Sequence, residues 1–354
     1  MREVPDGLRE ILKPVSRSFY LTLTVLPAGL RGPVGLAYLL ARAADTIADT
    51  RIIPRAERLR HLDIFREALE APVPSRPPDF APALTGPQQV PAERELLTRL
   101  PECLALYRGL ADADRRRIRN LLLTLTQGMQ TELRTFPGED EGRIVALASR
   151  ADLDRHTYYA AGCVGEFWTE MAVAHRPACH SWNAESMKRR GVRFGQGLQL
   201  TNVLRDLARD LRIGRCFLPR EDLALLGLMP GDLLDPAAIA RLRPLLRELL
   251  GRTLEHLAEG WAYTLTIPRG EMRLRLACTW PLFIGLRTLQ RIWEAPNLLD
   301  PKTRVKVSRP AVYAILARSS ALAWSDHALG RYYRALQGRT AAALTLADRR
   351  TEAA

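Results

Sequence analysis

Two acidic pairs far apart in the sequence have the residue types and the spacing of a metal-binding surface. The first pair is Asp45 and Asp49, and the second is Asp206 and Asp210. A spacing of four residues places both carboxylates of a pair on one face of a helix. Two stacked carboxylates on a buried helix need a cation, because a buried charge without a partner is costly. Asp oxygens that leave room for water and phosphate suit Mg²⁺, although an exposed pair on a surface helix is the commoner arrangement.

The stretch around the first pair predicts a helix that is buried on most sides. Residues 37–50 contain no Gly or Pro and are rich in Ala and Leu, a composition typical of helix. Tyr38, Arg42, Asp45 and Asp49 fall at offsets of 0, 4, 7 and 11, which is one helical face. Arg42 is therefore a second candidate for the cation beside the acidic pair.

A similar face is predicted in residues 196–210. Gln199, Asn202, Asp206 and Asp210 follow one another at steps of 3, 4 and 4, with Arg205 and Arg209 at the edge of this face. Two acidic faces on otherwise apolar helices predict one shared cavity with facing carboxylate walls. Such a cavity would hold Mg²⁺ ions and, through them, a diphosphate.

Four segments together resemble the squalene/phytoene synthase family, in the same order along most of the chain. They are residues 16–19 (Ser-Arg-Ser-Phe), 38–49, 201–210 and 214–219 (Gly-Arg-Cys-Phe-Leu-Pro). Each acidic pair alone is a weak signal, but the joint pattern is specific. The resemblance implies an all-α, single-domain isoprenoid synthase helical bundle with a central cavity.

The resemblance also implies a reaction. Family members join two prenyl diphosphates head to head through a cyclopropyl diphosphate. Squalene-forming members then reduce the second cation with NADPH, whereas phytoene- and dehydrosqualene-forming members lose a proton. Residues 45–49 (Asp-Thr-Ile-Ala-Asp) look like the squalene-forming motif, so we expect Mg²⁺-dependent conversion of farnesyl diphosphate to squalene. The alternatives are a phytoene, dehydrosqualene or presqualene diphosphate synthase without reduction and, from another class, a basic helical protein that binds nucleic acid or membrane.

Residue roles follow from the resemblance. The expected Mg²⁺ ligands are Asp45, Asp49, Asp206 and Asp210, and the expected diphosphate-binding residues are Ser16, Arg17, Ser18, Arg42, Arg205 and Arg215. The expected NADPH-binding residues are Arg17, Arg42, Asn202, Arg205, Lys306 and Arg309, and Tyr38 and Tyr159 are expected to act in catalysis with Asp45 and Asp206. The expected apolar lining is Phe19, Leu23, Ala161, Val164, Leu198 and Leu282.

The chain departs from the family pattern at several positions. Ala48 and Arg209 stand where eukaryotic squalene synthases place Glu before the last Asp, and Ser308 stands where we expect Arg. His156 occupies a place that is usually Tyr. The role of that Tyr passes to His156, Tyr158 or Tyr159, and we choose Tyr159.

Composition limits the class and the location of the protein. The formal charge of +13 suits a phosphorylated substrate, an anionic membrane surface or nucleic acid, although an Arg-rich proteome would give the same excess. No basic stripe interleaved with aromatic residues is evident, so no nucleic-acid partner is expected. The five cysteines never have Cys-x-x-Cys spacing, which favours reduced thiols. No signal peptide is visible and no uncharged run exceeds 13 residues, against the about 18 to 20 that a membrane span needs. We therefore expect a cytoplasmic protein with peripheral contact at the inner face of the membrane for product release.

The elements that must position these residues are helices within one domain, residues 1–354. Residues 72–91 carry seven prolines in twenty positions and predict a long loop. Residues 143–171 are expected to form one long helical stretch, and no structure is assigned to the tail 330–354. No strand followed by a Gly-rich turn and a helix occurs, so neither a Rossmann site nor a P-loop is supported.

Overall fold

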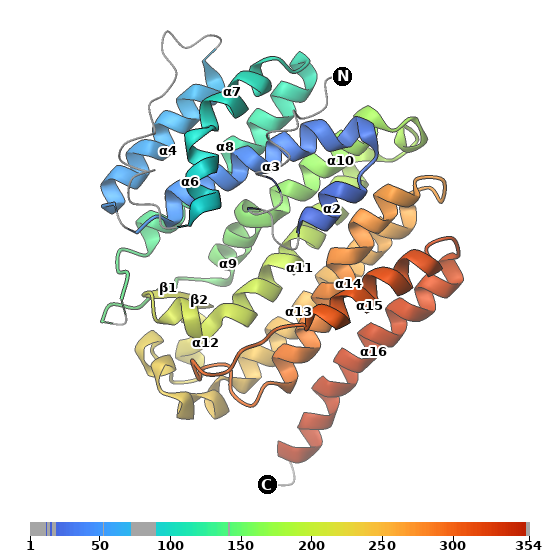
Figure 1. The fold of residues 1–354 in the computed structure, drawn as a ribbon. Coiled ribbons are helices and arrows are strands. Elements are labelled where there is room, and N and C mark those ends of the chain that lie inside the picture. The colour runs from blue at the N-terminus through green and yellow to red at the C-terminus, as the bar shows by residue number, and fades with distance from the viewer. Residues whose placement is uncertain are drawn as a thin grey trace. The chain divides into compact units, whose positions relative to one another are not determined.

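The protein is built almost wholly from α-helices, as the computed structural model shows (Figure 1). It describes Leu12, Val15 and residues 19–51, 53–71, 90–140 and 142–351; the side chains of Phe19 and of residues from 342 onward are not described. The chain divides into two compact units: Met1–Arg134 with Glu166–Ala184, and Thr135–Gly165 with Glu185–Ala354. The predicted all-α class is confirmed, whereas the single domain spanning residues 1–354 stays a prediction.

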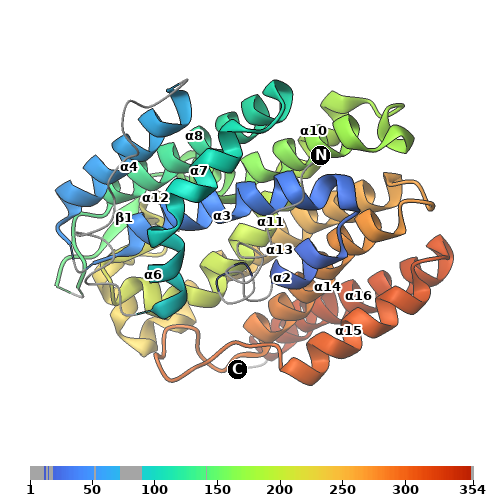
Figure 2. The same ribbon diagram turned by 45° about the horizontal axis from the view of Figure 1, so that its top comes forward.

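The first unit packs its helices around α3 (Ala28–Asp49). Helices α4, α6 and α7 all contact α3, and Figure 2 shows α6 crossing it. The other helices of this unit are α2 (Phe19–Val25), α4 (Arg55–Glu70), α6 (Pro91–Thr98), α7 (Leu100–Arg108), α8 (Asp112–Thr135), α10 (Cys163–His175) from Glu166 onward and the 3₁₀-helix η2 (Pro177–Cys179).

Helix α3 is buried on most sides, as its sequence predicts. Its Ala and Leu side chains from Leu36 to Ala48 supply much of the core of this unit. The side chain of Arg58, which is 0% exposed, donates from Nη1 to the carbonyl oxygen of Ala48 at 3.1 Å. A cation at the carboxyl end of a helix interacts favourably with the helix dipole and binds a carbonyl without an intrahelical partner. Arg58 therefore fixes the end of α3 that carries the acidic pair.

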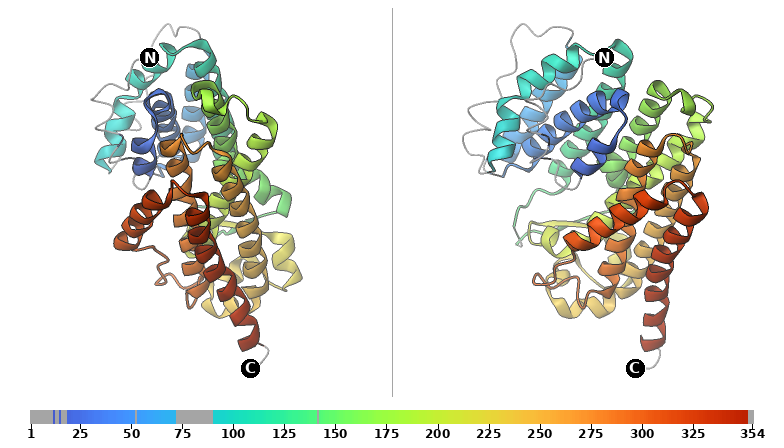
Figure 3. Two further views of the ribbon diagram at one scale, coloured as in Figure 1. Left: turned by 90° about the vertical axis from the view of Figure 1, so that its right-hand side faces the viewer. Right: turned by 45° about the vertical axis from the view of Figure 1, so that its right-hand side comes forward.

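The second unit contains the remaining helices and a small sheet. Its helices are α9 (Arg150–Thr157), the π-helix η1 (Tyr158–Gly162), α11 (Ala184–Leu211), α12 (Arg220–Leu225), the 3₁₀-helices η3 (Pro230–Leu234) and η4 (Pro236–Ala238), α13 (Ile239–Thr266), α14 (Met272–Glu294), α15 (Arg309–Leu322) and α16 (Asp326–Thr351). Helices α15 and α16 contact each other and α14, and their hairpin is seen from two sides in Figure 3. The tail from residue 330, to which the sequence assigned no structure, is helical through Thr351.

Glycines let α11 approach its neighbours within backbone distance. A Cβ on Gly195 would lie 2.1 Å from the carbonyl oxygen of Ala161, and a Cβ on Gly165 would lie 2.0 Å from that of Gly191. On the α13 side, a Cβ on Gly260 would meet the Phe194 ring at 2.5 Å. These contacts exclude any side chain at the crossings, so they fix the rotation of α11 and the direction of its polar face.

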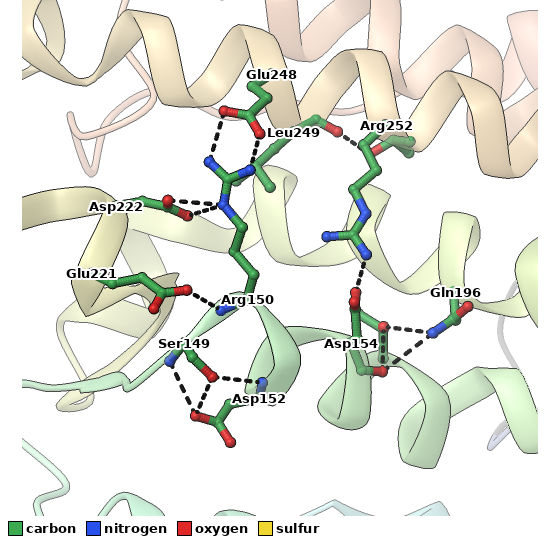
Figure 4. Close-up of polar contacts among 12 residues, drawn as sticks. Ser149, Arg150, Asp152, Asp154, Gln196, Glu221, Asp222, Glu248, Leu249 and Arg252 are labelled. Atoms are coloured by element: carbon green, nitrogen blue, oxygen red, sulfur yellow. Dashed lines mark hydrogen bonds and ion pairs between the residues drawn. The ribbon is translucent and has the colours of Figure 1, made fainter. Parts of the chain in front are cut away.

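An ion-pair network centred on Arg150 ties α9 to α12 and α13 (Figure 4). The guanidinium of Arg150 donates from Nε to Asp222 at 2.8 Å and from Nη2 to Glu248 at 2.9 Å, and the backbone N–H of Arg150 donates to Glu221. The side chain of Asp222 is 5% exposed, so removing Arg150 would leave a buried carboxylate without its cation. The network holds α9 and the chain around β2 in one arrangement.

The prediction of one helix from Arg143 to Met171 is wrong for the first residues of this stretch. Val145–Leu147 is a strand, β1, which pairs in parallel with β2 (Arg215–Pro219), Val145 lying opposite Arg215. Helix α9 starts only at Arg150, because Ser149 and Asp152 form a reciprocal capping box. Gly214, with a φ of +78°, makes the turn from α11 into β2, a conformation that costs Gly little.

The proline-rich loop predicted at 72–91 lies outside the described residues up to position 89, and Pro91 already begins α6. All five cysteines are free, as their spacing indicates, and all five are buried. Within the part of the chain that the structure describes, no helix is both long and apolar enough to cross a membrane.

The surroundings of one glycine on α11 and one on α13 predict opposite effects for two Gly→Ala substitutions. Gly195→Ala should lower the free energy of unfolding by about 1–3 kcal/mol, because its Cβ collides with backbone. Gly251→Ala on α13, where a Cβ meets nothing within 4 Å, should raise it by up to about 1 kcal/mol through helix propensity. Urea unfolding measures both, and a Gly195→Ala variant at least as stable as the parent would refute this crossing geometry.

Candidate active site

One face of α3 carries the first acidic pair together with its counter-charges. Arg42 forms an ion pair with Asp45 through Nη1 and contacts Glu93 Oε1 through Nη2 at 2.6 Å. Burial lowers the pKa of Arg42, but the charges of Asp45 and Glu93 outweigh it and raise that pKa overall. Asp49, one turn further along, is exposed. The predicted cation beside the pair is thus present as Arg42.

The carboxyl of Asp45 has an unusually high proton affinity. Its side chain is 42% exposed, yet partial desolvation raises its pKa to about 6, the negative charge of Asp49 adds to the shift, and Arg42 only partly opposes it. Because the pKa of Asp45 stays raised although Arg42 lies beside it, the positive charge near this carboxyl does not fully balance the negative charge. A further cation on this face would relieve that imbalance.

The face of α11 repeats this arrangement in the second unit. Arg205 donates to Asp206 from Nε at 3.0 Å and from Nη2 at 2.5 Å. Nη2 of Arg209 lies 3.6 Å from Oδ2 of Asp206 and 3.4 Å from Oδ1 of Asp210. Burial raises the pKa of Asp210 to about 6; Arg209 lowers that pKa and the charge of Asp206 raises it. Asn202 donates to Gln199 at 3.3 Å on the same face.

Strand β2 brings Arg215 toward this second face. Arg215 is the first residue of the strand, and its charge lowers the pKa of Asp210. Cys216, directly after it, is buried, and its thiol pKa is raised to about 12 by that burial. The thiol is therefore inert, and Arg215 is the group here that can meet an anion.

The aromatic candidates have different surroundings. Tyr38, on α3, donates from its hydroxyl to the carbonyl oxygen of Val15 at 3.4 Å. Tyr159 lies in the π-helix with its ring 5.8 Å from that of Tyr158. π-Helical turns are frequent at functional sites. His156 instead stacks on Phe217 at 4.3 Å, and burial together with Arg215 lowers its pKa to about 4. His156 is thus a neutral packing residue.

The segment that leads into α15 holds the remaining cofactor candidates. Lys306 and Arg309 are both exposed. Ser308, where we expected Arg, is the N-cap of α15 and accepts a hydrogen bond from the backbone N–H of Ala311 at 3.4 Å. A helix-capping role accounts for the Ser at this position.

Several predicted residues can be placed only in part. Ser16, Arg17 and Ser18 lie outside the described residues, as does the side chain of Phe19. Among the predicted lining residues, Leu23 and Leu282 are fully buried, so they belong to the cores of their units. Ala161, Val164 and Leu198 are partly exposed and can still line a cavity.

Sequence reasoning missed Glu93. This residue follows the proline-rich stretch at the first turn of α6, where an acidic residue is ordinary because it favours the helix dipole. Only the packing of α6 on α3 brings its carboxylate to Arg42. Its position in the sequence gave no signal of that contact.

The donor set fits Mg²⁺ in chemistry. Asp45, Asp49, Asp206 and Asp210 are all oxygen donors, which Mg²⁺ prefers, and two of them have raised pKa values that a cation would lower. Among the described residues, however, no group of three or more His, Cys, Asp or Glu side chains is assembled. Each face supplies two carboxylates, which matches a metal that keeps waters and phosphate oxygens as its other ligands.

The all-α fold and the two Asp-x-x-x-Asp helices fit the family that the sequence resembles. The family model for squalene/phytoene synthase matches residues 12–311, and the chain belongs to this family, whose members are prenyltransferases. It is 24% identical over 323 residues to squalene synthase of Schizosaccharomyces pombe and 25% identical over 301 residues to phytoene synthase 1, chloroplastic, of Zea mays. These matches cover 89% and 83% of this chain, and 66% and 62% of the two relatives.

Solved structures share the fold. A structure titled as TcSQS with the ligand E5700 matches with a TM-score of 0.72 at 23% identity, covering 96% of this chain and 97% of the other. A dehydrosqualene synthase in complex with a ligand matches with a TM-score of 0.63 at 21% identity, covering 89% and 94%. Both product classes are therefore represented among similar proteins.

The lowered pKa of His156 predicts a pH-dependent contribution to stability. Below its ordinary pKa of 6.5 the unfolded state binds a proton that the folded state refuses until about pH 4. The free energy of unfolding should therefore fall by up to about 3 kcal/mol between pH 6.5 and 4 on this account. His156→Phe keeps a ring against Phe217 and should lose this part of the pH dependence in urea titrations. Equal pH profiles for the two proteins would contradict the assignment.

Proposed function

We propose that the protein condenses two farnesyl diphosphates head to head and, with NADPH, forms squalene through presqualene diphosphate. The observation that carries the proposal is the matched pair of faces on α3 and α11. Each has two Asp residues four positions apart. Arg42 is bound to Asp45 on α3, and Arg205 and Arg209 are bound to Asp206 and Asp210 on α11. Two acidic faces of this kind can bind metal ions, and the metal ions can bind a diphosphate.

In this proposal the carboxylates and arginines together neutralise the leaving group. Asp45, Asp49, Asp206 and Asp210 would hold Mg²⁺, which supplies Lewis-acid stabilisation of the departing diphosphate. Arg42, Arg205 and Arg215 lie at the same faces and would donate to its oxygens, with Ser16, Arg17 and Ser18 contributing as the resemblance implies.

Other residues would protect and guide the carbocation left after ionisation. Water quenches such a cation, so the walls around it must be apolar, and Ala161, Val164 and Leu198 meet that need. Tyr38 and Tyr159 would stabilise the cation through their ring faces or move a proton at their hydroxyl oxygens.

Reduction is the step that uses the cofactor. NADPH would supply the hydride, and Lys306 and Arg309 would grip its phosphates from the exposed start of α15, with Arg17, Arg42, Asn202 and Arg205 as further contacts. The rival proposal is a synthase that stops at presqualene diphosphate or loses a proton to give phytoene or dehydrosqualene. Ser308 in place of the expected Arg and the similarity to a phytoene synthase favour that rival.

We propose further that the protein is cytoplasmic and touches the inner face of the membrane. A cytoplasmic protein that touches the inner face of the membrane would release a hydrocarbon product directly into lipid. The alternative of a nucleic-acid-binding helical protein has no support in the buried acidic helices.

Substitution of one Asp from each face tests the shared metal function. Asp45→Asn and Asp206→Asn should each lower kcat by several orders of magnitude, because each removes one charge from the metal ligands while the fold survives. Asp112→Asn at the exposed start of α8 should leave kcat unchanged and serves as the matched control. Diphosphate release from farnesyl diphosphate with Mg²⁺ is the assay, and near-parental turnover of either site variant would defeat the proposal.

The cofactor proposal predicts a separation of the two half-reactions. Without NADPH the protein should accumulate presqualene diphosphate or its hydrolysis products, and with NADPH it should form squalene, identified by mass. Lys306→Ala should raise the apparent KM for NADPH and leave the first condensation nearly unchanged, whereas Lys302→Ala should affect neither. An ultraviolet-absorbing dehydrosqualene or phytoene whose yield ignores NADPH would replace this proposal with its rival.

A further inference from the structure

Glu93 on α6 and Asp45 on α3 share the guanidinium of Arg42. Nη1 of Arg42 forms an ion pair with Asp45, and Nη2 donates to Oε1 of Glu93 at 2.6 Å. The two partners differ in their access to solvent, because the side chain of Glu93 is 16% exposed and that of Asp45 is 42% exposed. Asp45 is therefore the partner that a cation from solution can reach, whereas Glu93 belongs to the helix that crosses α3 (Figure 2).

The contact with Arg42 is not needed to hold α6 on α3. Leu96 and Leu97 of α6 are buried, so apolar side chains anchor this short helix in the core of the first unit. Pro91 stands in the first turn, where its missing N–H costs no hydrogen bond. An acidic residue in the first turn favours the helix dipole wherever its side chain points. The dipole alone therefore does not explain why the carboxylate of Glu93 reaches Arg42.

Two carboxylates surround one guanidinium here, which is one more than neutrality requires. Asp45 alone would balance the charge of Arg42, because it already pairs with Nη1. The second carboxylate has a role when the first one binds another cation. Mg²⁺ on Asp45 would compete with Nη1 for the same carboxylate, and Glu93 would then be the anionic partner that Arg42 keeps.

We propose that Glu93 is a positioning residue, which keeps Arg42 on the face of α3 when Mg²⁺ replaces the guanidinium at Asp45. The metal and the guanidinium are like charges on one face, so they repel each other. Glu93 holds Nη2 in place against this repulsion and leaves Nη1 to donate to an oxygen of the metal-bound diphosphate. A long side chain that is already ordered also loses less entropy when its ligand binds.

This inference rests on the proposed function in one respect, namely that the ligand is a diphosphate bound through Mg²⁺. A carboxylate at this place also has an opposing effect, because it repels an incoming anion. Once Asp45 binds the metal, however, Glu93 and Arg42 form a neutral pair, so the repulsion is small and positioning is the larger effect. Glu93 should therefore raise the affinity for the ligand.

Calorimetric titration of the full chain with inorganic pyrophosphate and Mg²⁺ tests the proposal without turnover. Glu93→Gln keeps the size of the side chain and removes its charge, so it should weaken pyrophosphate binding about tenfold. Glu95→Gln removes a charge from the exposed side of the same helix and should leave the affinity unchanged. In the Arg42→Ala background, Glu93→Gln should no longer weaken binding, because the side chain that Glu93 positions is gone.

The urea midpoint, measured without Mg²⁺, separates positioning from a structural role. Glu93→Gln should stay near the parental midpoint, because Arg42 keeps Asp45 as a partner and α6 keeps its buried leucines. Three results would overturn the inference alone: parental affinity in Glu93→Gln, tighter binding in that variant, and an equal loss of affinity with and without Arg42. Failure of the parent to bind pyrophosphate with Mg²⁺ would overturn both this inference and the proposed function.

Discussion

The structure depends on how two helices each carry a pair of like charges one turn apart. On α3, Asp45 lies one turn from Asp49, and on α11 Asp206 lies one turn from Asp210. Arginines already bind three of these acids, yet the pKa values of Asp45 and Asp210 remain raised to about 6. The faces are therefore short of positive charge. Like charges one turn apart destabilise a helix, so the acids point to a cationic ligand.

The rest of each unit holds these faces in place. In the first unit, Arg58 fixes the end of α3, and Glu93 holds Arg42 from α6. In the second unit, backbone contacts at Gly191 and Gly195 fix α11, and the Arg150 network fixes α9 next to the strand that carries Arg215. Rigid support of this kind is what a site needs when charge develops during a reaction, because groups already in place need not reorganise.

The sequence predicted the features that helical periodicity determines, namely the helices and the residues that share a helical face. The helical spacing of Tyr38, Arg42, Asp45 and Asp49 predicted both the helix and the counter-charge, and the second motif predicted α11 with its arginines. Prediction from the sequence failed where contacts between distant segments determine the local structure. Strand β1 exists because Val145 and Ala146 pair with β2 some seventy residues later, and Glu93 reaches Arg42 only through the packing of α6 on α3. His156 is a packing residue because Phe217 lies against it.

The proposed function requires that the two acidic faces serve one diphosphate through shared Mg²⁺. A double-mutant cycle on Asp45→Asn and Asp206→Asn tests it most directly, with Mg²⁺-dependent binding of a non-reacting farnesyl thiodiphosphate measured by calorimetry. If one ligand bridges the faces, the losses in binding free energy should be coupled, departing from additivity by about 0.5–3 kcal/mol. Losses that add to within about 0.5 kcal/mol, as for independent sites, would contradict the account.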